Sequence, residues 1–173
     1  MNIRMASKHD VSAIADIHST SWQENYSNVL STTYLEKEAP ADRLALWNTR
    51  FEKPQSNQQV LVAEVDGNTA GFVCLFADKH PEWGSHLDNL HVRKAYRSLG
   101  IGHTLFIEAA RWAYQQAPSK GMCLLVNQDN TKAQAFYQRL GGRKAQESIW
   151  NAADGSKVAT YWYVWEHLRE LTN

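Results

Sequence analysis

The chain alternates between short hydrophobic runs of strand type and longer segments in which hydrophobic residues recur at helical spacing. Apolar runs bounded by polar turns predict strands at residues 2–6, 59–65, 70–77, 85–92, 122–128, 143–150 and 157–165. Spacings of three and four residues predict a helix that begins near Lys8 and further helices at residues 42–52, 101–116 and 131–140. This order of elements predicts an α/β fold, with one mixed sheet and helices on both of its faces.

Some packing faces and turns follow from the same pattern. The expected inward stripes of the first two helices are Val11, Ile14, Ala15, His18 and Trp22, then Leu44, Trp47 and Phe51. Two polar turns, Asp66-Gly67-Asn68 and Ala153-Asp154-Gly155, are typical of β-hairpins, so the strands around each are expected to pair. Residues 77–85 are expected to form a loop that leads into the central strand.

Composition limits the class of protein. The chain has 173 residues and a formal net charge of zero, with a mean hydropathy of −0.52. It has no basic excess that would favour nucleic acid, no apolar run that could span a membrane and no hydrophobic core of a signal peptide at its start. No repeat or linker divides it, so we expect one cytoplasmic domain over residues 1–173.

The two cysteines, Cys74 and Cys123, each lie inside an apolar run. Such positions are typical of buried thiols in a reducing compartment, and a disulfide between them is the less favoured alternative. Two cysteines without clustered histidines argue against a zinc site, so no metal is expected.

The segment Arg97-Ser98-Leu99-Gly100-Ile101-Gly102 joins the central strand to the helix at residues 101–116. A helix that begins on glycines presents free N–H groups and the positive end of its dipole, which together with Arg97 predicts a site for a phosphate or pyrophosphate. The segment is not a P-loop, because no Gly-Lys-Ser/Thr follows the glycines. A dinucleotide-binding turn, and with it an oxidoreductase, is disfavoured because the third glycine and the later acidic residue are missing.

A second polar turn, Asn127-Gln128-Asp129-Asn130, precedes the helix at residues 131–140. Asn130 and Tyr137 are seven residues apart, so they lie on nearly the same side of that helix. The helix is expected to pack inward through Ala133, Phe136, Tyr137 and Leu140 and to end at Gly141-Gly142.

At this point the chain resembles the GNAT superfamily of acyl-CoA-dependent N-acetyltransferases. The residues that carry the resemblance are Leu90-His91-Val92, Tyr96-Arg97-Ser98-Leu99-Gly100-Ile101-Gly102, Asn130, Ala133, Phe136-Tyr137 and Leu140-Gly141. The spacing of the two blocks fits as well, and the order of elements extends the resemblance over nearly the whole chain. Lys94 stands where a proline is common and Ser98 where a glycine is common, which makes the turn at Ser98 less permissive.

The resemblance implies a fold and a cofactor site. The fold is a single GNAT domain, with a mixed, mostly antiparallel sheet of about seven strands flanked by helices on both faces. The strands at residues 85–92 and 122–128 would separate, and the pantetheine arm of acetyl-CoA would lie in the gap. The residues expected to bind acetyl-CoA are Leu90, His91, Val92, Arg97, Ser98, Leu99, Gly100, Ile101, Gly102, His103, Asn130, Ala133 and Tyr137.

The resemblance also implies catalytic roles. Tyr137 occupies the position from which a tyrosine commonly gives a proton to the departing CoA thiolate, and Asp88 is the expected base for the amine. A packed helical tyrosine and a structural carboxylate are the alternative interpretations, and a bulge in the strand leaves the face of Asp88 open. Trp22 and Tyr26, together with Asp88 and Asn89, are expected to contact the acceptor, whereas His18 is expected to pack in the core.

The implied reaction is direct transfer of an acetyl group from acetyl-CoA to a primary amine of a small molecule. The alternatives are acetylation of a protein N-terminus or lysine, and a CoA-binding regulatory protein without catalysis. Acids scattered among aromatic residues near the expected pocket suit a cationic or aromatic amine; they are Glu24, Glu36, Glu38 and Glu82. A homodimer through the tryptophans of the last two strands, Trp150, Trp162 and Trp165, is also left open.

Overall fold

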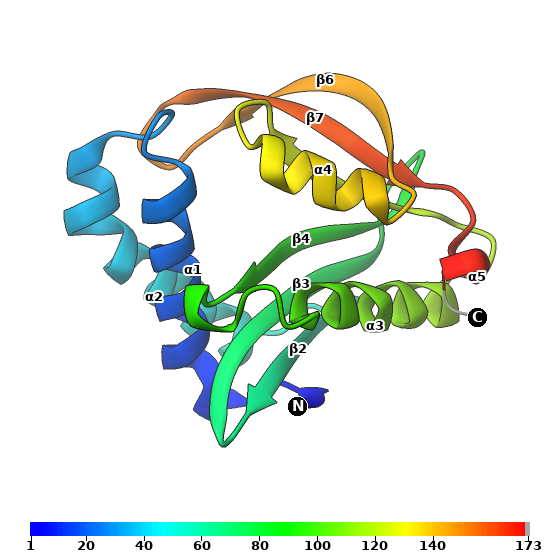
Figure 1. The fold of residues 1–173 in the computed structure, drawn as a ribbon, viewed down its shortest axis with the longest axis horizontal. Coiled ribbons are helices and arrows are strands. Elements are labelled where there is room, and N and C mark those ends of the chain that lie inside the picture. Colours follow the sequence, from blue (N-terminus) through cyan, green and yellow to red (C-terminus); the bar gives the residue numbers. More distant parts are fainter. Residues whose placement is uncertain (172–173) are drawn as a thin grey trace.

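The computed structural model describes residues 1–171 and contains one seven-stranded sheet (Figure 1). Its strands lie in the order β1-β2-β3-β4-β5-β7-β6. Their bounds are Asn2–Met5 for β1, Gln58–Val65 for β2, Asn68–His80 for β3, Gly84–Val92 for β4, Met122–Asn127 for β5, Arg143–Asn151 for β6 and Lys157–Trp165 for β7. Only β4 and β5 pair in parallel, so the prediction of a mixed, mostly antiparallel sheet is confirmed.

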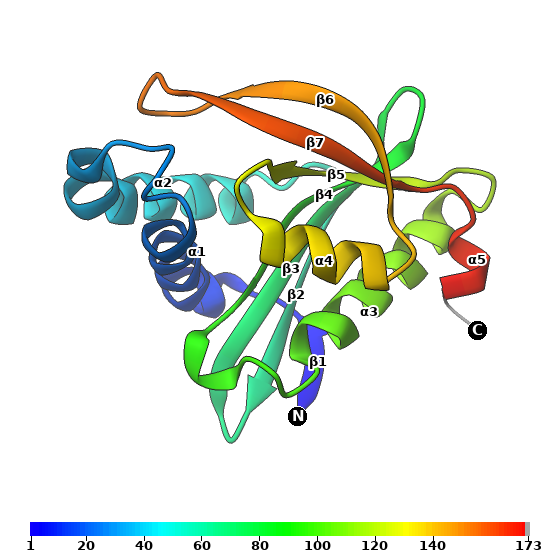
Figure 2. The same ribbon diagram turned by 45° about the horizontal axis from the view of Figure 1, so that its top comes forward.

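Helices cover both faces of this sheet. The longer ones are α1 (Val11–Asn25), α2 (Ala39–Glu52), α3 (Ile101–Gln116) and α4 (Thr131–Arg139), and α5 (Leu168–Leu171) is a single turn. Three short helical segments are also present: η1 (Lys8–Asp10), η2 (Tyr34–Glu38) and η3 (Lys94–Tyr96). Figures 1 and 2 show α1 and α2 side by side at one side of the sheet, with α3 and α4 at the other.

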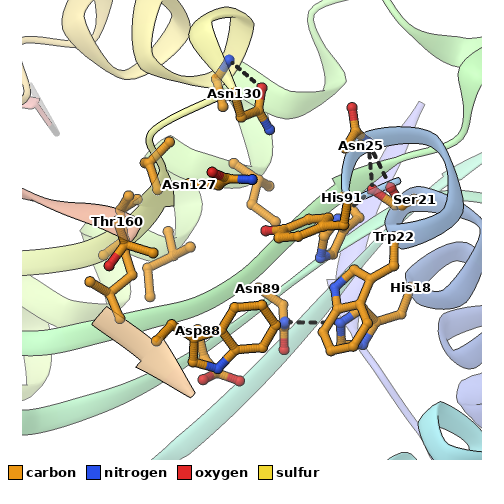
Figure 3. Close-up of a pocket in the computed structure, with 18 of the residues that line it drawn as sticks. His18, Ser21, Trp22, Asn25, Asp88, Asn89, His91, Asn127, Asn130 and Thr160 are labelled. Atoms are coloured by element: carbon orange, nitrogen blue, oxygen red, sulfur yellow. Dashed lines mark hydrogen bonds between the residues drawn. The ribbon is translucent and has the colours of Figure 1, made fainter. Parts of the chain in front are cut away.

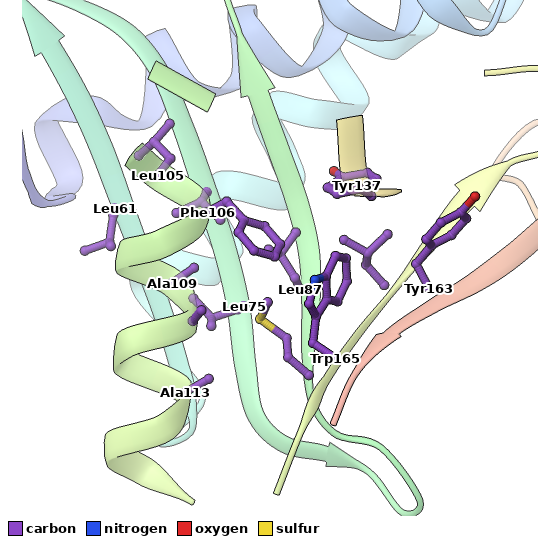
Figure 4. Packing of buried hydrophobic residues seen from close by; sticks show 14 of the residues in the cluster. Leu61, Leu75, Leu87, Leu105, Phe106, Ala109, Ala113, Tyr137, Tyr163 and Trp165 are labelled. Atoms are coloured by element: carbon purple, nitrogen blue, oxygen red, sulfur yellow. The ribbon is translucent and has the colours of Figure 1, made fainter. Parts of the chain in front are cut away.

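The alternation of side chains along β2 and β3 creates the two cores. Val60, Val62 and Phe72 point to α1 and α2, where they pack with Ile14 and the fully buried Trp47. The intervening residues of the same strands point to α3, against the face of that helix formed by Leu105, Phe106, Ala109 and Ala113 (Figure 4). Two-residue periodicity in strands thus fixes which helix covers which face.

The centre of the sheet opens between β4 and β5. These strands pair only at Ser85 with Met122 and at His86 with Cys123. Beyond His86, β4 continues along β3, whereas β5 continues along β7, and the two halves of the sheet diverge (Figure 2). Among residues 1–171, β4 therefore has no strand partner on its β5 side from Leu87 onward. Backbone groups of β4 that point to this side, apart from the Val92 carbonyl that accepts from Arg97, are left available there to an extended ligand.

Three local expectations were wrong. Residues 77–85 are not a loop, because β3 continues to His80 and β4 begins at Gly84. The ring of His80 stacks on Trp83 at 4.4 Å, a contact that sequence periodicity does not reveal. Leu44, expected to face inward, is 40% exposed. The helix α2 begins at Ala39, three residues earlier than expected, with a proline in its first turn.

The two cysteines and the tryptophans of the last two strands are buried or packed against other residues of this chain. Cys74 and Cys123 are buried free thiols, and burial raises the pKa of each to about 12. Trp165 lies in the core, Trp150 packs against Trp22, and Trp162 packs against Trp83. In residues 1–171, no helix combines the length and apolar character needed to cross a membrane. A homodimer stays a prediction.

Candidate active site

A cavity of about 770 Å³ lies where β4 and β5 separate. The residues expected at a cofactor or acceptor site that line it are Trp22, Tyr26, Asp88, Asn89, Leu90, His91, Val92, Arg97, Gly102, Asn130, Ala133 and Tyr137. Figure 3 shows how its side chains converge, with His18, Trp22 and His91 on one side and Asn127, Asn130 and Thr160 on the other. The structure thus gathers around one space two motifs that are separated in the chain by the stretch from Gly102 to Asn130.

The segment expected to bind phosphate has left-handed residues at its turn. Gly100 precedes α3 with a φ of 76°, which glycine adopts without strain. Ser98 also has a positive φ, 66°, at the position where the resemblance expects a glycine. This confirms that the turn requires a left-handed residue and that serine adopts it at some cost. The N–H groups of the first turn of α3 follow directly, as an anion site requires.

Arg97 lies beside this helix start and has partners inside the chain. Its Nε donates to the carbonyl of Val92 over 3.2 Å, and its guanidinium forms an ion pair with Glu24 at the end of α1. Glu24, expected among the acids of the acceptor pocket, is therefore engaged by Arg97 instead.

Some of the expected cofactor residues do not line the cavity: Ser98, Leu99, Gly100, Ile101 and His103. Ile101 has its side chain in the core at 1% exposure, and Leu99 is 62% exposed. Leu99 and Ile101 can therefore contribute only backbone groups to a phosphate site, which agrees with a loop that binds through N–H groups.

The strand β4 carries a bulge at the expected base. Asn89 pairs with Cys74 and Leu87 with Leu75, so Asp88 is the extra residue of the bulge. Both Asp88 and Asn89 line the cavity as a result. Oδ2 of Asp88 accepts a hydrogen bond of 2.8 Å from Nη2 of Arg50, and Oδ1 of Asn89 accepts one of 3.1 Å from Nη1.

The helix α4 supplies the other side of the site. The Oδ1 of Asn130 accepts a hydrogen bond of 3.0 Å from the N–H of Ala133, so Asn130 caps α4 as expected. Tyr137 is 9% exposed, and its ring packs against Phe136 and Trp165. Burial raises the pKa of Tyr137, and the nearby phenol of Tyr26 raises it further. Tyr137 therefore keeps its proton at neutral pH.

Two histidines, the buried His18 and the half-buried His91, form the wall opposite α4. The rings of His18 and His91 stack with centroids 4.9 Å apart. Nδ1 of His18 accepts a hydrogen bond of 3.1 Å from Nε1 of Trp47, and Nδ1 of His91 shares one of 2.8 Å with Oγ of Ser21. Burial lowers the pKa of both histidines, that of His91 to about 4. His18 is thus a packed histidine, as expected, and it also lines the cavity.

The helix α2 contributes residues that the sequence pattern missed. Arg43, Leu46 and Arg50 recur at spacings of three and four and line the cavity together. The sequence prediction considered only the apolar stripe around Trp47, although the spacing of Arg43, Leu46 and Arg50 indicates a second face of the same helix. Conversely, the acids expected near the acceptor do not line the cavity; they are Glu24, Glu36, Glu38 and Glu82. Asp88 is the only acid among the lining residues.

Within residues 1–171, no group of three or more His, Cys, Asp or Glu side chains is arranged to hold a metal ion. The cavity is lined by four cationic side chains, Arg43, Arg50, Arg97 and Lys132, and among the described residues by one acid, Asp88, a balance that matches an anionic ligand.

The open β4–β5 pair, the glycine-initiated helix and the buried tyrosine form the arrangement that the resemblance implies, and comparison of the sequence with known families tests it. Residues 13–142 match the model of the acetyltransferase (GNAT) family. The chain therefore belongs to this family, whose members are acetyl-CoA-dependent N-acetyltransferases.

Known relatives share the fold. An uncharacterized N-acetyltransferase of Methanocaldococcus jannaschii is 35% identical over 83 residues, which cover 47% of this chain and 51% of the relative. This match spans about half the length of the curated relative. A GCN5-related N-acetyltransferase of Rhodopseudomonas palustris has a similar structure, with a TM-score of 0.75 and 22% identity, over 95% of this chain and 94% of the other. A PaiA N-acetyltransferase of Thermoplasma acidophilum, solved in complex with coenzyme A, has a TM-score of 0.64 and 20% identity, over 92% and 96% of the two chains.

Proposed function

We propose that this chain transfers the acetyl group of acetyl-CoA directly to a primary amine of a small molecule. The observation that carries the proposal is the cavity between β4 and β5, which is lined by Gly102 at the start of α3 as well as by Asp88 and Tyr137. One continuous space thus connects an anion site with a carboxylate and a buried phenol. The family to which the chain belongs supports the same reaction.

The cofactor would bind mainly to backbone groups. Its pyrophosphate would rest on the N–H groups between Arg97 and Gly102, and its pantetheine arm would lie along β4 at Leu90 and Val92. The absence of a strand partner for this part of β4, among the described residues, supports that position. Gly102 leaves space there, because a Cβ on it would come within 3.6 Å of Phe136 and no closer to any other residue.

The reaction joins the amine nitrogen to the acetyl carbonyl and breaks the bond between that carbonyl and sulfur. The amine must first be neutral, because an ammonium ion has no lone pair and an alkyl amine with a pKa near ~10 is mostly protonated at pH 7. Asp88 would accept the proton from the amine, and N–H groups near Leu90 would stabilise the charge on the carbonyl oxygen. Tyr137 would give its proton to the departing thiolate.

Direct transfer is favoured over an acyl-enzyme because neither cysteine is placed to act. Cys74 and Cys123 are buried, and neither lines the cavity. Burial raises the pKa of both to about 12, so neither forms a thiolate readily.

A small acceptor is favoured over a protein because both sides of the cavity are joined at one end. The rings of Trp22 on α1 and of Tyr26, which directly follows α1, contact Trp150 on β6, with centroids 5.5 Å and 6.0 Å apart. The N–H of Ser31 also donates to Oδ2 of Asp154 in the β6–β7 turn over 2.7 Å. A polypeptide would need this end to open, whereas a small amine would not.

The test begins with thermal unfolding of the protein with millimolar acetyl-CoA, with NADH as the control. A ligand at 100 times its Kd adds about 2.7 kcal/mol of stability, so acetyl-CoA should raise the midpoint and NADH should not. Release of CoA thiol in the presence of amines then separates an enzyme from a CoA-binding regulatory protein. Failure of acetyl-CoA and CoA to raise the midpoint would exclude the proposed function.

A further inference from the structure

The wall of the cavity formed by α2 is rich in arginine. Arg43 and Arg50 lie seven residues apart on α2, which places them on one face about 10 Å apart along the helix axis. Their side chains are 11% and 17% exposed, so both charges are largely removed from solvent. Leu46 lies between them and also lines the cavity.

The two arginines differ in how their charges are satisfied. Arg50 has acceptors within the cavity, because it donates to Asp88 over 2.8 Å and to Asn89 over 3.1 Å. Arg43 donates to Oδ2 of Asp42 over 2.8 Å, but Asp42 lies outside the cavity and also accepts from the hydroxyl of Tyr34. No acid that lines the cavity pairs with Arg43.

Arg43 is also short of a hydrogen-bond acceptor. Its Nε is buried and has no partner among residues 1–171. Its guanidinium lies over the ring of Trp22, 4.3 Å from the ring centroid, so its plane is held in place beside an expected acceptor residue. A buried donor without an acceptor is unfavourable, and a carboxylate is the group that a guanidinium binds best.

We propose that the acceptor is a small amine that also carries a carboxylate, and that Arg43 binds this carboxylate while Asp88 receives the amine. The proposal rests on the proposed function and narrows its substrate class. It replaces the cationic or aromatic amine that the scattered acids of the sequence suggested. The ion pair of Arg50 with Asp88 is complementary to such a zwitterionic ligand, since it presents one positive and one negative charge beside the bound molecule.

The experiment compares matched acceptors that differ only in the carboxylate. Phenylalanine is compared with phenethylamine, and β-alanine with ethylamine, by CoA thiol release at saturating acetyl-CoA. We expect at least one carboxylate-bearing acceptor to have a kcat/KM about tenfold or more above that of its partner, since a site built for a polar group discriminates strongly against its absence.

The Arg43→Met variant tests the residue. It should lower kcat/KM for the carboxylate-bearing acceptor by about 10- to 100-fold and change that of the partner amine by less than about threefold. Arg43→Lys, which keeps the charge but loses the planar fork, should fall between the two. Arg111→Met is the matched control, because Arg111 pairs with Glu108 on α3 and does not line the cavity.

The outcomes separate this inference from the proposed function. If acetyl-CoA fails to stabilise the protein, the proposed function itself is wrong. If acetyl-CoA binds and the amines without a carboxylate react as well as their partners, the inference is wrong and the proposed function stands. The inference is also overturned if acetyl-CoA binds but carboxylate-bearing amines are neither acetylated nor, by calorimetry, bound by the complex of the protein with CoA. Equal losses on both acceptors in folded Arg43→Met and Arg43→Lys would assign Arg43 a structural role.

Discussion

The indole Nε1 of Trp47 donates a hydrogen bond of 3.1 Å to Nδ1 of His18, across 29 residues of sequence and in the fully buried interface between α1 and α2. Because Nδ1 is the acceptor, the neutral imidazole carries its proton on Nε2. That nitrogen lies 3.5 Å from Nδ2 of Asn89, at the cavity (Figure 3), and because both nitrogens are then donors this contact is not a hydrogen bond. Core packing of α1 on α2 thus fixes the tautomer of a side chain that lines the site.

Trp47→Phe should therefore destabilise the protein and remove the hydrogen bond that selects the Nε2–H tautomer of His18. The variant leaves a buried acceptor unsatisfied and a small cavity, which together should cost about 2 to 4 kcal/mol of unfolding free energy in urea. The nitrogen chemical shifts of His18 should then lose their preference for the Nε2–H form. Trp83→Phe, at a partly exposed position, is the control and should cost much less. Equal losses for both variants would contradict the role given to the hydrogen bond.

The buried histidines should make the protein less stable in mild acid. The pKa of His91 falls from 6.5 to about 4 in the folded state, because burial disfavours the imidazolium. Between these values the unfolded chain binds a proton that the folded chain does not, so stability falls as the pH falls through this window. Well above pH 6.5 the imidazole of His91 is neutral in both states, so its protonation no longer lowers stability. From pH 7 to pH 5 the loss should be roughly 2 kcal/mol for His91, with His18 adding to it.

Urea unfolding at pH 7 and pH 5 measures this dependence. His91→Asn, which can keep the contact with Ser21, should flatten the slope. His9→Gln removes an exposed histidine and should leave the slope unchanged. An unaltered slope in His91→Asn would mean that another group titrates in this window. The pKa of Asp10 is lowered from 3.8 to about 2, so its ionised form stabilises the protein throughout this window. That stabilisation is lost only at lower pH, as the pH falls through 3.8 towards 2.

Gly102→Ala should separate cofactor binding from folding. An added Cβ would meet Phe136 at 3.6 Å and Val92 at 3.7 Å, which are ordinary contacts, so the fold should accept it. Alanine should even favour the helix by up to about 1 kcal/mol. The same methyl group would stand where the pyrophosphate approaches the backbone, so we expect the Kd of acetyl-CoA to rise about tenfold, measured by calorimetry.

The contrasting variant is Gly71→Ala. There an added Cβ would lie 2.7 Å from the backbone carbonyl of His91, so β3 and β4 would have to move apart. This variant should lose stability as well as affinity. If Gly102→Ala bound acetyl-CoA like the unchanged protein, the pyrophosphate would have to bind elsewhere.

Local pattern was enough to predict most of the helices and strands, because the core depends on short-range periodicity, while the number and mostly antiparallel pairing of the strands came from the family resemblance. Alternation in β2 and β3 and the stripe around Leu105 on α3 each correspond to one buried face. The missed features depend on particular side-chain contacts that hydrophobic periodicity does not encode. The stacking of His80 on Trp83 extends a hairpin, and no local signal marks it.

The site was predicted less completely, for a related reason. The motif around Gly102 and the pair Asn130 and Tyr137 are local signals, and the structure brings them to one cavity. Arg43 and Arg50 have no motif, and only the packing of α2 on α1 turns them toward that cavity. Counting acids near aromatic residues failed because Glu24 is held by Arg97. Charge in a pocket depends on which side chains face it, not on which segments surround it.

Tyr137→Phe should remove the proton donor without removing the cofactor site. Phenylalanine can keep the packing of the ring against Phe136 and Trp165. We expect thiol release to fall by about 10²- to 10³-fold while the stabilisation by acetyl-CoA stays unchanged. Tyr114→Phe on α3, outside the cavity, is the control and should retain full activity. Full activity in Tyr137→Phe would make Tyr137 a packed helical tyrosine.

Asp88→Asn should slow the reaction in a way that depends on pH. Asparagine keeps an oxygen that can accept from Arg50, so the bulge in β4 should persist and the loss should be chemical. At pH 7 the amine is mostly protonated, and without a base kcat/KM should fall by about 10²-fold.

This deficit should shrink as the pH rises towards ~10, where the amine is neutral without help. The measurement is the ratio of kcat/KM between the unchanged protein and the variant from pH 7 to pH 10. Asp16→Asn is the matched control, because Asp16 also pairs with an arginine, Arg93, but lies 57% exposed and outside the cavity. A ratio that stays constant with pH would assign Asp88 to holding Arg50 and Asn89 in place, since a positioning role does not depend on the protonation of the amine.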